Sequence, residues 1–164
     1  MAASLTAQVN QRLACARMLH TDLASARSPV HKRALLDACL FHLLCGYQFY
    51  IKELASYYGV KYVQGLKSET DAAQALSQLD KHPAEIQELC NLAELPNSWL
   101  SQLRGLYDDV WAMPGKVSAI DANAIAVTNL DAQRLPELDD ELIAQFCRQF
   151  QELVNRHRET SVEC

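Results

Sequence analysis

Three side chains that can bind a metal ion recur at three-residue steps along one apolar stretch of the chain. They are Cys39, His42 and Cys45. A helix has about 3.6 residues per turn, so their direction drifts by about 60° at each step, and one helix cannot aim all three at one ion. A metal site would need further ligands, and the chain offers Cys15, His20 and His157. The favoured interpretation is small apolar thiols flanking a hydrogen-bonded core histidine, so we predict no metal and no cofactor.

A second group of residues suggests a pocket for a small molecule. Five tyrosines could give an apolar pocket its hydroxyl groups, although such residues also fill cores whose rims are wet: Tyr47, Tyr50, Tyr57, Tyr58 and Tyr62. Arg17 facing Asp37, or His42 beside a tyrosine hydroxyl, could supply acid and base groups. The candidate ligand-binding residues are therefore Arg17, His42, Tyr47 and Tyr50, and we predict no catalytic residue.

The common sequence motifs of enzymes are missing from the chain. It contains no G-x-G-x-x-G, no G-x-x-x-x-G-K-[ST], no H-E-x-x-H and no C-x-x-C. The Glu-x-x-His pattern of carboxylate-bridged di-iron bundles is also absent. RNA-cleaving bundles of the HEPN type carry an arginine, four to six residues and then a histidine, and no arginine here has that spacing. These absences leave enzyme activity open but make a non-enzymatic role the leading interpretation.

The elements that must position the candidate residues are helices. Leucine occurs 24 times and alanine 22 times, whereas valine and isoleucine together occur 14 times and glycine and proline together 10 times. A chain of 164 residues is long enough for one ordinary domain, which we place at residues 1–164. We predict an all-α fold: a helical bundle of three to four long helices plus a short helical hairpin.

Apolar spacing and capping residues predict six helices, at residues 5–26, 29–59, 68–79, 83–95, 98–113 and 136–159. Ser28 before Pro29 is a typical N-cap, Ser68 with Asp71 resembles a capping box, and Gly59 suits a left-handed C-cap. Residues 115–135 show no periodicity, and their role stays open. Residues 160–164 are expected to form a frayed tail.

The second helix should be long, central and buried. Its apolar residues alternate steps of four and three without a fault, over Leu36, Leu40, Leu43, Tyr47, Tyr50, Leu54 and Tyr57.

The charge is unevenly distributed along the chain. The net charge is −5, but residues 1–67 carry eight lysines and arginines against three acids, while residues 68–164 carry seven against seventeen. The first stretch is therefore +5 and the second −10. The two halves could attract each other within one molecule or across a dimer, or a basic surface could bind an anionic ligand. No aromatic residue interleaves with the early basic residues, and we predict no nucleic-acid partner.

Several segments resemble a known family. The first helix carries Asn10-Gln11-Arg12-Leu13 and Ala16-Arg17, and the second carries Leu40-Phe41-His42-Leu43 and Ile51-Lys52-Glu53-Leu54-Ala55 together with Tyr47 and Tyr50. These segments resemble a family of small, all-helical bacterial proteins known as a domain of unknown function, mainly over residues 5–58. The resemblance implies a compact, cytoplasmic helical bundle of bacterial origin, and it implies no activity.

The sequence also bears on location and role. No window of about 18 consecutive apolar residues exists, and residues 1–23 lack the order of a secretory signal, so we expect no membrane association and a cytoplasmic protein. The leading hypothesis is a non-enzymatic module that binds a protein partner or itself as a homodimer. The alternative is a small-molecule-binding bundle or unrecognised enzyme with a pocket near the tyrosine-rich second helix.

Overall fold

The computed structural model describes residues 4–112 and 135–162, and within those ranges it contains helices and no strand. The all-α prediction is confirmed. The helices are α1 (Leu5–Asp22), α2 (Pro29–Tyr57), α3 (Glu69–Ser77), α4 (Ala84–Glu94), α5 (Trp99–Trp111) and α6 (Asp140–Val162), with a short 3₁₀ turn, η1 (Leu23–Ser25), after α1.

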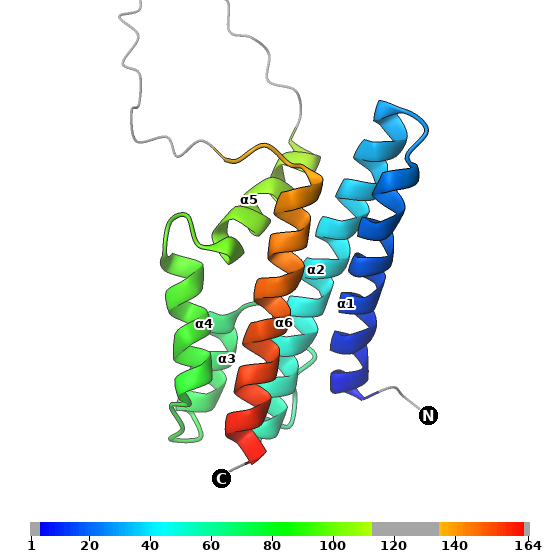
Figure 1. Ribbon diagram of the computed structural model, residues 1–164. Helices are drawn as coiled ribbons and strands as arrows, with labels where there is room; N and C mark the ends of the chain where they lie inside the picture. Colours follow the sequence, from blue (N-terminus) through cyan, green and yellow to red (C-terminus); the bar gives the residue numbers. More distant parts are fainter. Residues whose placement is uncertain (1–3, 113–134, 163–164) are drawn as a thin grey trace, which may run out of the picture.

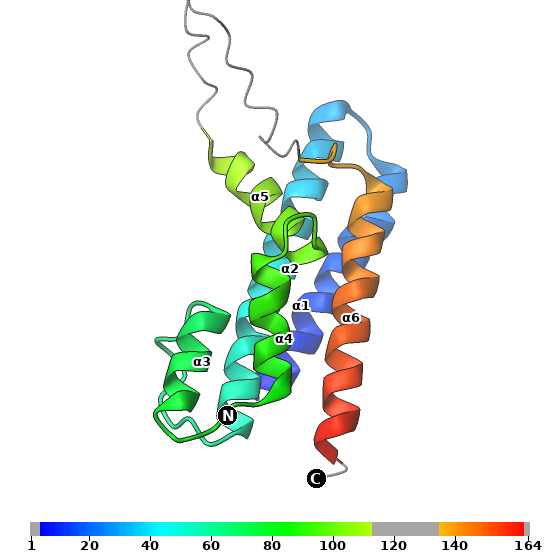
Figure 2. The same ribbon diagram turned by 90° about the vertical axis from the view of Figure 1, so that its left-hand side faces the viewer.

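Helix α2 is the centre of the fold. It packs against α1, α3, α4, α5 and α6. Helices α1, α2 and α6 run side by side over most of their length (Figure 1), and α1 and α2 form an antiparallel hairpin. Figure 2 shows the shorter helices α3 and α4 as a second hairpin, with α4 alongside α2. Every candidate site on α2 therefore faces a different neighbour.

Capping side chains set the helix starts where the sequence predicts them. The Ser28 hydroxyl accepts a hydrogen bond from the His31 amide at the start of α2. Ser68 and Asp71 form a complete capping box on α3. Gly59 has a φ of +99°, the left-handed conformation that glycine adopts without strain, two residues after the end of α2.

The predicted stripe of α2 is buried from Leu36 to Leu54, and Tyr47 and Tyr50 are fully enclosed. Its last member was predicted wrongly, because the Tyr57 side chain is 56% exposed. Tyr57 lies on the final turn of α2, where the neighbouring helices leave an open pocket rather than a core. Tyr62 is also far from the core, at 89% exposed.

Helix α6 differs from the prediction at both ends. It begins at Asp140, four residues after the predicted start, because the Asp139 carboxylate accepts a hydrogen bond from the Leu142 amide and so caps the helix there. The tail predicted to fray from residue 160 continues as helix to Val162, so that prediction is wrong over residues 160–162. The aperiodic segment 115–135 lies outside the described residues, apart from Leu135.

The two oppositely charged halves pack together without pairing their charges as the sequence suggests. Among the described residues, arginine pairs with carboxylate in Arg33–Asp37, Arg104–Glu69, Arg156–Glu88 and Arg158–Glu53. Of these, Arg158–Glu53 alone joins the two halves. Its arginine belongs to the acidic half, residues 68–164, and its glutamate belongs to the basic half, residues 1–67. Within these ranges, no base of residues 1–67 forms an ion pair with an acid of residues 68–164.

Helix α2 is long and apolar enough to cross a membrane by length and composition. A buried core helix of a water-soluble protein passes the same test, so this finding is weak evidence in either direction.

Candidate functional site

Tyr47 and Tyr50 lie one helical turn apart on α2, and each hydroxyl belongs to a separate polar network. Both rings contact Phe150 of α6 edge to face, at 6.1 and 6.0 Å between ring centres. Both phenols are buried, which raises the pKa of each hydroxyl above its usual value. At neutral pH the two tyrosines are therefore uncharged hydrogen-bonding groups.

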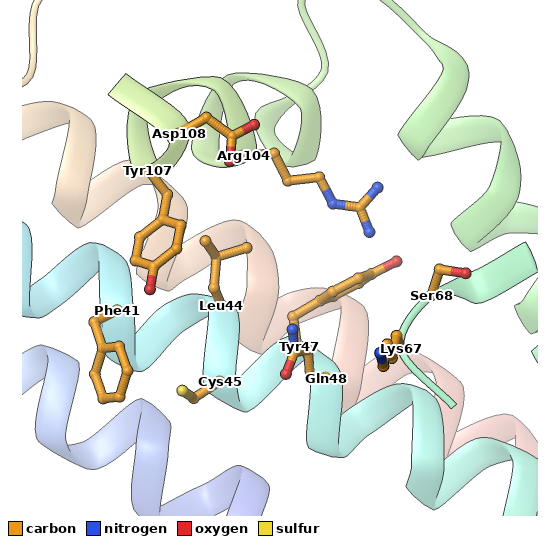
Figure 3. Close-up of a pocket in the computed structure, with 10 residues that line it drawn as sticks. All are labelled: Phe41, Leu44, Cys45, Tyr47, Gln48, Lys67, Ser68, Arg104, Tyr107 and Asp108. Carbon is orange, nitrogen blue, oxygen red and sulfur yellow. The ribbon is translucent and has the colours of Figure 1, made fainter. Parts of the chain in front are cut away.

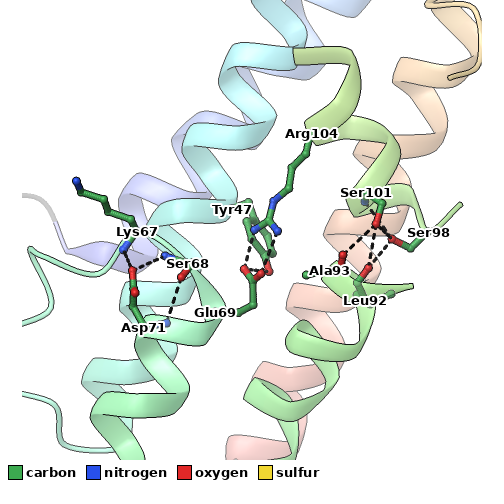
Figure 4. A network of polar contacts seen from close by, with 10 residues as sticks. All are labelled: Tyr47, Lys67, Ser68, Glu69, Asp71, Leu92, Ala93, Ser98, Ser101 and Arg104. Atoms are coloured by element: carbon green, nitrogen blue, oxygen red, sulfur yellow. Dashed lines mark hydrogen bonds and ion pairs between the residues drawn. The ribbon is translucent and has the colours of Figure 1, made fainter. Parts of the chain in front are cut away.

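The first network joins Tyr47 to α3 and α5. The Arg104 guanidinium donates two hydrogen bonds to the Glu69 carboxylate, from Nη1 to Oε1 at 2.9 Å and from Nη2 to Oε2 at 2.6 Å (Figure 4). The Tyr47 hydroxyl donates to the same Oε2 atom at 3.2 Å, and Arg104 lies 5.4 Å from the centre of the Tyr47 ring. Burial alone would raise the pKa of Glu69, but the hydrogen bonds from Arg104 outweigh it, and the pKa is lowered. Glu69 is therefore an ionised carboxylate that fixes the position of Arg104.

A pocket of about 480 Å³ opens beside this network, between α2, α5 and the residues that precede α3. Figure 3 shows an apolar end, formed by Phe41, Leu44 and Tyr107, and a polar end formed by Arg104, Lys67 and Ser68, where the Arg104 side chain extends toward the Tyr47 hydroxyl and Ser68. The remaining lining residues are Cys45, Tyr47, Gln48 and Asp108. We call this cavity the α2–α5 pocket.

The second network joins Tyr50 to α6 and α4. The Tyr50 hydroxyl lies 2.7 Å from Nδ1 of His157, and Nε2 of His157 lies 2.9 Å from Oε2 of Glu88. Arg156 in turn donates two hydrogen bonds to the Glu88 carboxylate, of 2.9 and 2.6 Å. The hydrogen bond from Arg156 is the main reason that the pKa of Glu88 falls to about 2. The His157 side chain is enclosed, so this relay runs from the core to the surface.

A second pocket, of about 540 Å³, lies between the first turn of α1 and the last turns of α2 and α6. Its charged wall is the ion pair between Arg158 and Glu53, at 2.9 Å. Asn10 and Thr6 bond to the same pair. All three nitrogens of the Arg158 guanidinium are therefore engaged by protein groups.

The other two candidate residues lie away from both networks. His42 contacts Arg12 of α1, with Nδ1 and Nη1 3.3 Å apart, and burial together with that cation lowers the pKa of His42. Arg17 donates to Gln151 of α6. The suggested pairing of Arg17 with Asp37 is wrong, because Asp37 pairs with Arg33 at 2.8 Å. Among the described residues, no hydrogen bond joins His42 to a tyrosine hydroxyl either.

The cysteine and histidine series on α2 has separate partners rather than a shared centre. The Cys39 thiol is buried and donates to the Ala16 carbonyl at 3.5 Å, whereas His42 faces Arg12. Over residues 4–112 and 135–162, no group of three or more histidine, cysteine or carboxylate side chains is arranged to hold a metal ion.

Sequence reasoning did not assign five residues to the two networks: Glu69, Glu88, Arg104, Arg156 and His157. Of these, His157 was named only as a possible metal ligand. One signal was present for His157, which continues the inward spacing of Phe150, Leu153 and Val154 on α6. The partners of Tyr47 and Tyr50 come from helices far along the chain, so no local pattern reveals them.

The fold and its two networks define an all-α protein in which helices surround a single central helix. The chain belongs to a family whose model matches residues 1–164 and whose description is "Family of unknown function (DUF6586)". No curated protein and no solved structure matches it.

Proposed function

We propose that this chain is a non-enzymatic, cytoplasmic interaction protein that binds an acidic surface of a partner protein. The binding region is the α1–α2 tip, which we define as residues 27–34. One observation carries the proposal: all eight residues of this tip are exposed, although six of them belong to α2. Exposed side chains on a helix end are available to a partner protein.

The charge of the α1–α2 tip favours an anionic partner. It carries Arg27, Lys32 and Arg33 and no acid. Of these, only Arg33 forms an ion pair in the described part of the chain, with Asp37 on the next turn. The amino end of α2 adds a partial positive charge. Figure 1 shows that the turn between α1 and α2 extends beyond the first turn of α6.

The composition of the tip favours a protein over a nucleic acid. It has no aromatic side chain on which a base could stack, and the chain as a whole carries a charge of −5. Val30, in the middle of the tip, is 79% exposed and offers an apolar contact between the cations. An apolar anchor within a charged rim is typical of a protein interface. A cytoplasmic location is supported by the free thiols of the five described cysteines.

A matched pair of charge reversals tests this proposal. The tip variant Arg27→Glu/Lys32→Glu is compared with Lys61→Glu/Arg148→Glu, which makes the same change at exposed residues elsewhere. Both variants should melt close to the wild type, because the substituted residues are exposed. Proteins captured from the native cell extract by the wild type and the control should be lost with the tip variant. Their capture should weaken as salt rises to about 1 M, where the Debye length is about 3 Å.

Two results would contradict the proposal. The first is equal capture by the tip variant and the control. The second is that the captured material is nucleic acid, detected by its removal with nuclease. Sedimentation of the purified chain at low salt separates partner binding from self-association, since a homodimer forms without any extract.

A further inference from the structure

The α2–α5 pocket has the size and the divided lining of a small-molecule site, which is independent of the proposed protein interface. Its volume of about 480 Å³ lies within the range of about 300 to 1,000 Å³ seen for ligand pockets. Phe41, Leu44 and Tyr107 line one end, and Arg104, Lys67 and Ser68 line the other (Figure 3). A ligand that fits both ends has an apolar part and a polar part.

Arg104, at the polar end of the pocket, is held in place and still has unused hydrogen-bond donors. Glu69 engages Nη1 and Nη2 of Arg104, and the Tyr47 ring supports the guanidinium from the side (Figure 4). A guanidinium has five N–H donors, and these two bonds use two of them. No other hydrogen bond of this guanidinium is found within residues 4–112 and 135–162. Arg104 can therefore bind a ligand without giving up Glu69.

The accessible charge at this end is positive. The Lys67 side chain is exposed, and its ammonium group makes no ion pair with the described residues. Two of the nearby carboxylates are already engaged: Glu69 is 4% exposed and bonded through both oxygens, and Asp71 accepts the amides of Lys67 and Ser68. The third, Asp108, lines the pocket one turn after Arg104 on α5. A carboxylate is the group that two such cations and the Ser68 hydroxyl recognise best.

The opposite end selects an aromatic ring. Phe41 is 44% exposed even though it is a large apolar residue, and it lies at the same end of the pocket as Tyr107, which comes from α5 (Figure 3). Aromatic rings stack edge to face or offset against each other, and this contact adds to the gain from simple burial. The second pocket lacks this combination, because the nitrogens of its arginine are already engaged by Glu53 and Asn10.

We propose that the α2–α5 pocket binds a small aromatic carboxylate, with the carboxylate at the Arg104 end, where the exposed Lys67 side chain also lines the pocket, and the ring between Phe41 of α2 and Tyr107 of α5. Asp108 lines the same pocket from the next turn of α5, on the side of Tyr107 rather than of Lys67 (Figure 3). Its negative charge opposes a simple carboxylate. Replacing Asp108 with asparagine should therefore tighten binding, which is an effect opposite in sign to that of the other substitutions.

The test is a titration of the full chain with 3-phenylpropionate, followed by calorimetry and by amide chemical shifts. The alcohol 3-phenylpropanol and plain acetate are the matched probes that each lack one half of the ligand. 3-Phenylpropionate should shift amides around Leu44, Lys67 and Arg104, and both control probes should bind at least fivefold more weakly. Lys67→Gln should weaken binding by about fivefold, the most that an exposed ion pair of about 1 kcal/mol provides. Asp108→Asn should strengthen it by a few-fold.

The control variant is Lys61→Gln, an exposed lysine outside the lining of the pocket, which should bind as the wild type does. Phe41→Ala should weaken binding of 3-phenylpropionate and leave the weak binding of acetate unchanged. Four results would overturn the proposal: no binding of 3-phenylpropionate, equal binding of 3-phenylpropanol, shifts confined to the Glu53–Arg158 pocket, or equal losses in Lys67→Gln and Lys61→Gln.

Discussion

The two polar networks of α2 both provide hydrogen-bond partners for a buried tyrosine hydroxyl, but they differ in how deeply the carboxylate is buried. Each takes a buried tyrosine hydroxyl and connects it through a carboxylate to an arginine. In the Tyr47 network the carboxylate is buried, at 5% side-chain exposure, and in the Tyr50 network the carboxylate of Glu88 is 35% exposed. The histidine takes the buried place in the second network, with His157 at 3%.

This difference determines what each network can do. Glu69 is held from several sides, so its charge serves to orient Arg104 beside the α2–α5 pocket. Glu88 lies at the surface, where water screens its pairing with Arg156, and the buried member of this network is His157. One network therefore presents a fixed cation to an open cavity. The other links the core to the surface, and it presents Tyr50 rather than a cation to the second pocket.

The largest effect should come from Phe150, which both tyrosines share. Its side chain is fully buried between Tyr47 and Tyr50 and stacks on Trp99 at 5.9 Å. Phe150→Ala should lower the free energy of unfolding by about 3 to 5 kcal/mol, because it removes a large core ring and leaves a cavity. Chemical denaturation with circular dichroism measures this loss. A cost below about 1.5 kcal/mol would mean that the two networks hold the helices without this ring.

The next effect should separate the two carboxylates. Glu69→Ala should cost about 2 to 3 kcal/mol, since it leaves Arg104 and the Tyr47 hydroxyl without their buried acceptor; partial exposure of Arg104 keeps the cost below that of a fully buried pair. Glu88→Ala should cost about 1 to 2 kcal/mol, because its partner Arg156 is well exposed while the buried His157 also loses a partner. At about 1 kcal/mol per 2 to 4 °C, the melting temperatures should differ measurably. The reverse order would refute the assignment of the buried and exposed carboxylates.

A smaller effect should distinguish the two tyrosines. Tyr50→Phe removes a 2.7 Å contact with an enclosed histidine and should cost about 1 to 2 kcal/mol. Tyr47→Phe removes a longer contact, 3.2 Å, and Glu69 keeps both hydrogen bonds from Arg104, so the cost should stay near 1 kcal/mol or below. Equal costs would show that contact length and remaining partners do not decide the outcome.

The sequence predicted the helices far better than the networks. Ser28, Ser68 and Gly59 act on their own neighbours along the chain, so a local pattern is enough to locate the ends of α2 and the start of α3. The burial of Tyr47 and Tyr50 in the apolar stripe of the central helix was predicted correctly, and their role in binding a ligand stays a prediction. Their partners depend on which turn of α3, α4, α5 or α6 faces them, and that information lies in packing rather than in spacing.

The failed predictions have the same cause. The sequence allows Arg17 and Asp37 to pair, but the Arg33 side chain contacts Asp37 from one turn earlier on the same helix. Tyr57 continues the apolar stripe of α2 in sequence, but the helices around it end before they cover it. Even the charge difference between the halves says little about contacts, because only Arg158–Glu53 joins them among the described ion pairs.

The smallest effect is a pH dependence that belongs mainly to the Tyr50 network. The pKa of Glu88 falls from 4.5 to about 2 in the folded protein, chiefly through its hydrogen bonds from Arg156. The unfolded chain therefore binds a proton at a higher pH than the folded one. The stability that this group adds is complete above its unfolded pKa and is lost as the pH falls through about 2. Melting temperatures of the wild type and of Glu88→Gln, measured downward from about pH 6, should converge as the pH falls through this window. Added salt should shrink the difference in melting temperature between the wild type and Glu88→Gln, because Glu88 and Arg156 are exposed enough for ions to screen them.

The difference in melting temperature between the wild type and Glu69→Gln should depend less on salt, since the Glu69 carboxylate is buried. If salt reduced both differences equally, the contrast between a buried and an exposed carboxylate would have no basis in electrostatics.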